Sequence, residues 1–524
     1  MTLREMSLAA TGAVLLLAGA RMASHNRPTT HELPPLSRCS VPVTVLNGDA
    51  PEKSRPVVVV FHGFSGNRRI MNLLGRGMAA AGARVYLVDL PGHGDSTERF
   101  LYSRAEHCAL EVLEELESRG EIAPENTVLV GHSMGAGIVV RLADEYPVAA
   151  TIAISAVLRM PPEVRPAEIT LLEMPRRMPS NLLILVGQLD LPPARQMAEK
   201  LLAAAGGERT APEDFRQRRA VRRVILPLAT HTSVLFDRRV AALAADWIRN
   251  LEPEQTPVSA APSALPVLGG LAGLAGLLLL FPAAASFLAG VVGGKVSTTR
   301  QDKLKVPSAA LILGVWGVAG LVAVSVQART ILLVAVIPSR GGDYLASIAL
   351  VGGALLLAAL WKTGRTHRCA PTLAWFTDFR GMAAGAALGL ITILAFGAWL
   401  DWQFTDAWPN AARWEVFGLL LPFFLLYLLA EEAALGPPTE KRIRRLALFF
   451  GLRAALWLAI VFGLVVLHSG EVLPILLALY LALFSLLQRL GADAVRRRTG
   501  SPAGAALFSA ILAAWFIAAV FPLG

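Results

Sequence analysis

Cysteine is scarce in this sequence: Cys39, Cys108 and Cys369 are the only three among 524 residues. Three cysteines spread this widely are too few for a zinc site or for a framework of disulfides. Cys39 and Cys108 pair only if their domain lies in an oxidising compartment, and two unrelated buried thiols are the simpler interpretation. The cysteines therefore predict no metal centre and no disulfide-rich fold.

Sequence motifs for metals and nucleotides are also missing. The nine histidines show no His-Glu-x-x-His pattern, and no Gly-x-x-x-x-Gly-Lys loop occurs. The net charge of +10 is not gathered into a compact basic motif with interleaved aromatic residues, which argues against nucleic-acid binding. We therefore expect no metal, no cofactor and no nucleic-acid partner.

Charged residues are scarce as well, and they are unevenly spread. They make up 17% of the chain, whereas hydrophobic residues make up 54%. Soluble domains usually contain roughly 25% charged residues, so part of this chain is expected to lie in lipid. Acids and bases are mixed up to residue 251, whereas long apolar stretches follow one another beyond residue 262. This change predicts a soluble domain followed by a membrane domain.

The first 23 residues are typical of an export segment. Arg4 precedes an apolar run at residues 7–20, which has the length of a signal-peptide core and is short for a membrane span. Ala18-Gly19-Ala20 offers a small-residue cleavage pattern, and a short anchor that extends to Ala23 is the alternative. The sequence thus predicts a signal peptide or an N-terminal membrane anchor over residues 1–23.

Residues 35–252 are predicted to form an α/β domain with a mostly parallel sheet and helices on both faces. Its strand candidates are continuous apolar runs, as buried parallel strands require. We expect strands at residues 56–61, 84–89, 127–130, 150–154, 181–186 and 223–228. Apolar spacing predicts helices at residues 103–118, 135–145, 193–205 and 238–249.

A linker at residues 253–265 leads to an all-α membrane domain at residues 266–524. We predict about eight spans in it, centred near residues 278, 317, 353, 391, 425, 457, 480 and 513. The preceding domain is therefore attached to a multi-pass membrane domain.

Basic residues in the loops between these spans predict the orientation. The loops after the first, third, fifth and seventh spans hold sixteen, and the intervening loops hold only Arg329, Arg340 and Arg413. The sixteen are Lys295, Arg300, Lys303, Lys305, Lys362, Arg365, Arg368, Arg380, Lys441, Arg442, Arg444, Arg445, Arg489, Arg496, Arg497 and Arg498. Because positive loops stay in the cytoplasm, we expect an integral plasma-membrane protein whose α/β domain is extracytoplasmic.

The pentapeptide Gly131-His132-Ser133-Met134-Gly135 fits the Gly-x-Ser-x-Gly nucleophile elbow. It follows a predicted strand and precedes a predicted helix, as this motif requires. Glycine on both sides of the serine permits a tight turn that a side chain would block. Ser133 is therefore the candidate nucleophile.

With its surroundings, the elbow resembles the α/β-hydrolase superfamily over about residues 41–251. The resemblance rests on the elbow and on two segments that follow the first two predicted strands, His62-Gly63-Phe64-Ser65-Gly66 and Asp89-Leu90-Pro91-Gly92-His93-Gly94-Asp95-Ser96. It implies an acid at Asp190, in Val186-Gly187-Gln188-Leu189-Asp190, and a base at His231, after the last strand. It also implies that the backbone N–H groups of Met134 and Phe64 form an oxyanion hole.

Several of these residues have alternatives. Asp214 and Asp237 are the rivals of Asp190, but their polar, helix-like surroundings favour a solvated surface position. His62 and His93 lie in loop segments of the superfamily, where a role in shaping the loops is favoured over proton transfer. Ser133, Asp190 and His231 thus form the predicted catalytic triad.

Three features bear on the substrate and on the membrane domain. Residues 157–180 are the only room for a cap, and they form either a small amphipathic flap or a plain surface loop. The tryptophan-rich residues 399–414 indicate an interfacial belt or a platform that presents lipid to Ser133. Arg453 is expected to pair with Glu431 or Glu432 within a helical hairpin, with snorkelling as the alternative.

These observations favour a membrane-tethered serine hydrolase that cleaves an ester, with a membrane lipid or another hydrophobic acyl compound as its substrate. Amide and thioester cleavage use the same triad, so the sequence leaves the reaction class open beyond acyl transfer. The alternative from another class is a transporter or assembly scaffold whose hydrolase-like domain only binds a ligand or partner.

Overall fold

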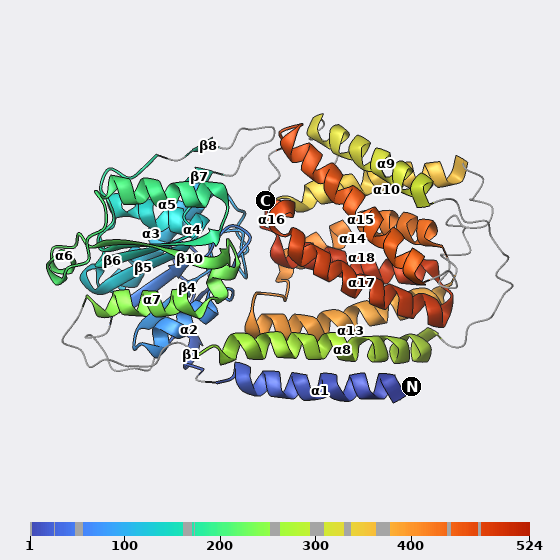
Figure 1. The fold of residues 1–524 in the computed structure, drawn as a ribbon, viewed down its shortest axis with the longest axis horizontal. Coiled ribbons are helices and arrows are strands. Elements are labelled where there is room, and N and C mark those ends of the chain that lie inside the picture. Colours follow the sequence, from blue (N-terminus) through green and yellow to red (C-terminus); the bar gives the residue numbers. More distant parts are fainter. Residues whose placement is uncertain are drawn as a thin grey trace.

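The computed structural model describes two domains side by side, an α/β domain and a helical domain (Figure 1). The described residues are 3–25, 27–47, 56–160, 170–171, 173–251, 263–293, 309–329, 337–362, 378–436, 442–469 and 473–524. The C-terminus lies between the two domains, and the N-terminus lies at the end of the helical domain farthest from the sheet (Figure 1). This arrangement confirms the predicted fold class.

The α/β domain contains an eight-stranded sheet of order β1-β2-β4-β3-β5-β6-β9-β10. Strands β4, β3, β5, β6, β9 and β10 are parallel, and all six predicted strands are found among them. The sequence interpretation missed β1 and β2, which add an antiparallel edge. The bounds are Thr30–Glu32 (β1), Val43–Leu46 (β2), Val57–Phe61 (β3), Arg84–Val88 (β4), Thr127–His132 (β5), Ala150–Ile154 (β6), Leu182–Leu189 (β9) and Val221–Thr230 (β10).

Helices cover both faces of this sheet. Alternate side chains of β3 serve opposite faces, with Val58 and Val60 in the core beneath α2 and α7, and Val59 and Phe61 in the core beneath α3 and α4. The helices are α2 (Asn72–Ala80), α3 (Tyr102–Ser118), η1 (Pro124–Asn126), α4 (Met134–Arg141), η2 (Leu142–Asp144), α5 (Pro192–Ala204), α6 (Pro212–Arg216), η3 (Ser233–Phe236) and α7 (Arg238–Arg249). The four predicted helices are confirmed, and α2 and α6 were missed.

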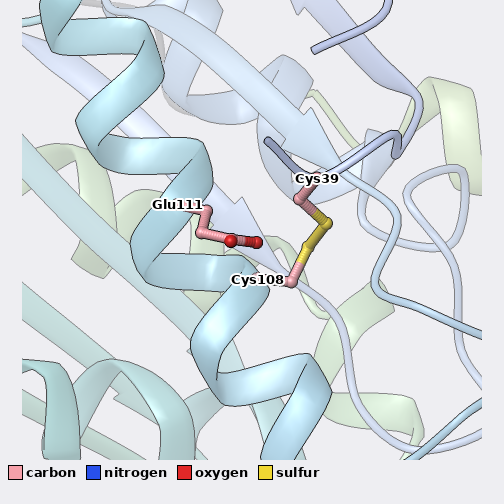
Figure 2. Close-up of side chains that lie close together, drawn as sticks. All are labelled: Cys39, Cys108 and Glu111. Carbon is pink, nitrogen blue, oxygen red and sulfur yellow. A yellow bond between two sulfur atoms is a disulfide. The ribbon is translucent and has the colours of Figure 1, made fainter. Parts of the chain in front are cut away.

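Cys39 and Cys108 form a disulfide, so the interpretation as two unrelated thiols is wrong. Their Cα atoms are 5.6 Å apart, and the bond joins the segment before β2 to helix α3 (Figure 2). Their pairing could not be predicted from the sequence because 69 positions separate the two cysteines. Glu111 lies beside the bond, but its carboxylate accepts from Arg104 at 2.6 Å, and the joined sulfurs offer no thiolate to a metal.

Removing this disulfide is expected to destabilise the α/β domain by about 4 kcal/mol, because the bond closes a long loop in the unfolded chain. The test is pulse proteolysis in urea of the full-length protein in detergent, comparing wild type with Cys39→Ala/Cys108→Ala. A reducing agent should lower the urea midpoint of wild type to that of the double variant and leave the variant unaffected. An unchanged midpoint in the double variant would contradict the prediction.

The helical domain contains helices that run alternately between the two sides of the bundle, and most of them are long and apolar. They are α8 (Leu265–Gly293), α9 (Ala309–Arg329), α10 (Gly342–Lys362), α13 (Phe379–Gln403), α14 (Ala411–Leu435), α15 (Arg442–Val465), α16 (Leu473–Leu476), α17 (Ala478–Thr499) and α18 (Pro502–Val520). Among the described residues, eight helices are long and apolar enough to span a membrane, and one of these is α1 (Leu3–Ala23). Seven of the eight spans predicted after the linker are among them.

The exception is the span predicted near residue 480, because α17 is too polar to be counted with the apolar helices. Its polar side chains turn into the bundle: Arg489 donates to Glu432 at 2.6 Å, and Gln488 donates to the carbonyl of Ser509 at 2.8 Å. The predicted Arg453–Glu431 contact is confirmed at 3.2 Å. Buried charges are thus paired inside the bundle, as they must be in a medium that cannot solvate them.

Helix α1 lies along α8 (Figure 1). Glycines face each other across this contact, and a Cβ atom built on Gly19 would lie 2.5 Å from the backbone nitrogen of Gly273. A Cβ atom built on Gly12 would likewise lie 2.8 Å from the carbonyl oxygen of Gly276. Such close backbone approach is typical of helix pairs within membranes.

The helical domain packs against the carboxyl edge of the sheet. Ser65 donates to the carbonyl of Val520 at 2.7 Å, and Phe100 donates its N–H to Leu523 at 2.7 Å. Arg413, at the start of α14, is buried in this interface and donates to the carbonyls of Gly94 (2.8 Å), Gly92 (3.0 Å) and Ala518 (2.7 Å). Its guanidinium therefore joins a loop of the sheet to the carboxyl end of α18.

The tryptophan-rich residues 399–414 lie at the same interface. Trp399 is buried and donates its indole N–H to the carbonyl of Gly270, and the ring of Phe404 packs against Phe236. Trp408 and Trp414 remain 39% and 38% exposed. Part of this stretch therefore holds the two domains together.

Candidate active site

Ser133, Asp190 and His231 each follow a strand of the parallel sheet. Ser133 follows β5, Asp190 follows β9 and His231 follows β10. The carboxyl ends of parallel strands meet at one edge, so the three side chains are brought to the same place although 98 positions separate Ser133 from His231. It is the edge that faces the helical domain.

The turn at Ser133 is strained in the manner of a nucleophile elbow. Ser133 has φ 53° and ψ −112°, in the region that disfavours residues with a side chain. A Cβ atom on Gly131 would lie 2.2 Å from the carbonyl oxygen of Gly135, and one on Gly135 would lie 2.4 Å from that of Phe61. The two glycines are thus required by close backbone approach, which lifts the serine hydroxyl out of the sheet.

A continuous chain of hydrogen bonds joins the three side chains. The Nε2 atom of His231 lies 2.9 Å from the Oγ of Ser133, and its Nδ1 lies 2.7 Å from the Oδ1 of Asp190. With Asp190 as the acceptor at Nδ1, the proton of neutral His231 sits on that nitrogen, and Nε2 is free to accept from the serine. The Asp190 side chain is fully buried, and that of His231 is 11% exposed.

Two backbone amides flank Ser133. Met134 is the first residue of α4, and the loop that carries Phe64 passes close to the serine, since a Cβ atom on Gly63 would lie 3.0 Å from the Cβ of Ser133. Among the described residues, neither amide makes a backbone hydrogen bond. The N–H groups of Met134 and Phe64 therefore remain available to a ligand at Ser133.

Comparison with known proteins identifies the family of this domain. The family model described as the alpha/beta hydrolase family matches residues 57–265. The α/β domain belongs to the α/β-hydrolase superfamily. A comparison with curated proteins finds no match.

Solved structures similar to the hydrolase domain include esterases and other serine hydrolases. A Pyrobaculum calidifontis esterase is 15% identical over 48% of this chain and 94% of its own, with a TM-score of 0.33. TT1662 from Thermus thermophilus is 22% identical over 43% of this chain and 99% of its own, with a TM-score of 0.32. XC6422 from Xanthomonas campestris, an α/β serine hydrolase without a lid, is 15% identical over 44% of this chain and 97% of its own, with a TM-score of 0.31.

Within the hydrolase domain, Asp190 is held by more than the imidazole. Its carboxylate accepts from the hydroxyl of Ser155 and from the backbone N–H of Leu191 at 2.7 Å. Burial by itself raises the pKa of Asp190, but the hydrogen bonds from His231, Ser155 and Leu191 outweigh it and bring the pKa below its ordinary value. Ser155 follows β6 at the same edge, and the sequence interpretation missed it because no motif marks it.

His132, directly before the nucleophile, was also missed. Its Nε2 lies 2.8 Å from the backbone carbonyl of His231, and the two rings pack at 5.1 Å. Complete burial, and secondarily the nearby His231, lower the pKa of His132 to about 3, so it is neutral at pH 7 and donates to that carbonyl. His132 thus fixes the backbone that carries the base.

His62 and His93 shape the neighbouring loops, as the sequence predicts. His62 accepts from the N–H of Leu90 at 2.9 Å, which ties the loop after β3 to the loop after β4. The ring of His93 packs between Phe64 and Phe100. Burial lowers the pKa of both histidines, so they are neutral at pH 7.

The two rival acids lie elsewhere. Asp214 accepts from the N–H of Ala211 and pairs with Arg219, and Asp237 caps α7 by accepting from the N–H of Arg239 at 2.9 Å. Neither carboxylate contacts His231. Asp214 is buried, so the predicted solvated surface position is wrong for it, because its carboxylate holds the turn at Ala211. Both acids serve local structure.

Three carboxylates near the domain interface, those of Asp89, Asp95 and Asp406, lie close enough together to suggest a cation site. The buried guanidinium of Arg68 already stands among them, pairing with Asp89 and, at 2.9 Å, with Asp95. The positive charge is therefore supplied by the chain itself.

The segment at residues 157–180, which the sequence left open between a flap and a plain loop, falls partly outside the described residues, which omit 161–169 and 172. Of the remainder, β7 (Arg159–Met160) pairs antiparallel with β8 (Thr170–Leu171).

Proposed function

We propose that this protein is a membrane-tethered, extracytoplasmic serine hydrolase that cleaves an ester of a lipid or of another hydrophobic acyl compound. The observation that carries the proposal is the hydrogen-bonded chain from Ser133 through His231 to Asp190, at the edge of the sheet that faces the helical domain. A serine that serves only the fold has no need of such a chain, whereas acyl transfer requires it.

The geometry supports acylation in a defined order. His231 Nε2 takes the proton from Ser133 as the serine Oγ attacks the carbonyl carbon of the ester. Asp190 keeps the imidazole in the correct tautomer and stabilises the imidazolium. His231 then gives the proton to the departing alcohol, leaving an acyl-serine. A water molecule, activated by His231, attacks the acyl-serine and releases the carboxylic acid.

The tetrahedral intermediate carries a negative oxygen that needs nearby donors. The backbone N–H groups of Met134 and Phe64 are proposed to meet it, and the amino end of α4 adds its positive dipole. Each donor of this kind contributes about 3 kcal/mol in other acyl hydrolases. Because these are backbone groups, conservative side-chain changes at the two positions should have little effect.

The position of the site supports a hydrophobic substrate. His231 and Thr232 lie against the helical domain, where Tyr480 at the start of α17 donates to the hydroxyl of Thr232 at 3.2 Å. The aromatic ring of Phe64 packs among apolar side chains of the same domain. This position therefore favours an acyl ester that is dissolved in the bilayer as the substrate.

Most of the sixteen basic residues support an outward-facing hydrolase domain, whereas Arg445, Arg489 and Arg496 are buried in ion pairs within the bundle and do not count as loop charges. Asp401 at the end of α13 and Arg413 at the start of α14 contact this domain, and each helix has 25 residues. The opposite end of α13, with Arg380, therefore lies roughly 35 Å away. With α1 packed along α8, we propose that residues 1–23 are retained as an anchor.

The enzyme proposal is tested by labelling with a fluorophosphonate probe, which reacts with activated serines. The purified full-length protein in detergent should be labelled at Ser133, and Ser133→Ala should abolish the labelling. Folded wild-type protein that remains unlabelled would contradict the proposal and favour a transporter or scaffold.

The orientation is tested with a thiol reagent that does not cross membranes. In a Cys369→Ser background, a cysteine at Arg498, which is exposed at the end of α17, should not react in intact cells. A cysteine at Lys200, exposed on α5, is the matched control and should react. After the cells are opened, both should react. Labelling at position 498 in intact cells would overturn the orientation.

A further inference from the structure

An apolar groove opens in the helical domain, between helices α15 and α17, with α10, α14 and α18 behind it. Its cavity volume is about 100 Å³, and it is open on one side. Leu345, Leu481 and Ile517 line the end nearest the hydrolase domain, and Tyr427, Arg453 and Gln488 line the opposite end. Between Leu481 and Gln488 the groove is roughly 10 Å deep, by the rise of the helix.

The end of this groove nearest the hydrolase domain lies beside residues that pack against the loops of the candidate active site. Phe64, from the loop that supplies the proposed oxyanion donor, packs in the same apolar cluster as Leu345, Phe516 and Ile517, all of which line the groove. On the other side, Tyr480 precedes Leu481 and donates to Thr232, the neighbour of His231. Phe64 and Tyr480 therefore link this end of the groove to the residues around Ser133.

The end of the groove away from the hydrolase domain, here called the lower end, is closed by polar groups that are already paired. Gln488 donates to the carbonyl of Ser509 at 2.8 Å, Tyr427 accepts from the indole of Trp316 at 2.9 Å, and Arg453 donates to Glu431. These groups make the lower end a poor place for hydrocarbon. The apolar part of the groove therefore ends at these polar residues.

We propose that the groove holds the acyl chain of the substrate ester, with the chain lying between α15 and α17 and its carbonyl carbon at Ser133. The inference rests on the proposed function and adds to it where the hydrocarbon chain of the substrate binds. A lipid tail fits because α15 belongs to the apolar helices long enough to span a membrane, so the open side of the groove faces lipid. The acyl chain enters sideways from the bilayer while its ester stays at the membrane surface.

The test fills the groove and compares two acyl lengths. Ala513 lines the groove and is only partly buried, so the ring in Ala513→Phe should fill the interior of the groove. Leu481→Trp should narrow the end of the groove nearest the hydrolase domain. Ala482→Phe is the matched control, because Ala482 is exposed and does not line the groove. The substrates are p-nitrophenyl palmitate and p-nitrophenyl butyrate, presented to the full-length protein in detergent micelles.

Both groove variants should lower kcat/KM for the palmitate ester about tenfold or more and leave the butyrate ester within about twofold of wild type. The control should match wild type on both esters. Fluorophosphonate labelling at Ser133 reports whether each variant has a folded site. A second measurement on wild type alone is photo-crosslinking by a lipid with a diazirine in its acyl chain, which should label α15 or α17.

The outcomes separate this inference from the proposed function. If Ser133-dependent hydrolysis occurs but the filled groove leaves palmitate hydrolysis unchanged, the groove proposal is overturned and the hydrolase proposal stands. Crosslinks confined to helices outside the groove would overturn it in the same way. If neither ester is hydrolysed in a Ser133-dependent manner, both proposals fall.

Discussion

Ser133→Ala is expected to lower kcat for p-nitrophenyl butyrate by roughly 10⁴-fold or more, since it removes the group that forms the acyl intermediate. The residual rate over water should come from the oxyanion donors and from substrate binding, which the substitution leaves intact. The loss should therefore appear in kcat, with KM changed little. Steady-state kinetics of the full-length protein in detergent measure both quantities.

The control for this substitution is Ser118→Ala, on the outer end of α3, where the hydroxyl only contacts the carbonyl of Glu115. That variant should retain wild-type kinetics. The stability of Ser133→Ala should be close to that of wild type, because alanine keeps the strained φ of 53° at this position. A Ser133→Ala protein that keeps more than about 1% of wild-type kcat would show that another residue carries the reaction.

Asp190→Asn is expected to lower kcat roughly 10⁴-fold although it removes only one charge. An asparagine amide at this position can donate to Nδ1 of His231, which places the imidazole proton on Nε2, where it can no longer accept from Ser133. The carboxylate also stabilises the imidazolium that forms during acylation. Steady-state kinetics with p-nitrophenyl butyrate again provide the measurement.

Asp214→Asn and Asp237→Asn are the matched controls for this prediction. Both change an aspartate of the same domain that does not contact His231, so each should keep kcat within about threefold of wild type. Their effects should fall on stability, because each carboxylate holds a helix terminus. A large loss of kcat in either control, with Asp190→Asn active, would assign the acid elsewhere.

Much of this protein follows from local sequence. The six parallel strands are continuous apolar runs, and the elbow serine lies between a strand and a helix that are both readable from sequence. Asp190 and His231 follow strands in the expected order, and parallel strands bring their ends to one edge. The three side chains could therefore be named before any distance was known.

Local sequence was a poorer guide where residues act through distant partners. The disulfide between Cys39 and Cys108 depends on how β2 and α3 pack, so spacing alone favoured two separate thiols. Ser155 and His132 carry no motif, and their roles exist only through contacts with Asp190 and with the carbonyl of His231. Helix α17 was predicted as an ordinary span although its arginines pair with acids on other helices.

The sequence by itself determined the fold class, because hydrophobic periodicity is a property of short segments. The resemblance to the α/β-hydrolase superfamily then named Ser133, Asp190 and His231 as the candidate triad. Only the tertiary structure decided what lies around them. Arg413, which counts in the sequence as a basic loop residue, is buried between the domains, and the carboxyl end of the chain packs against the loop after β4. Such contacts join segments more than 300 positions apart, and the geometry of packing, which no local pattern encodes, selects them.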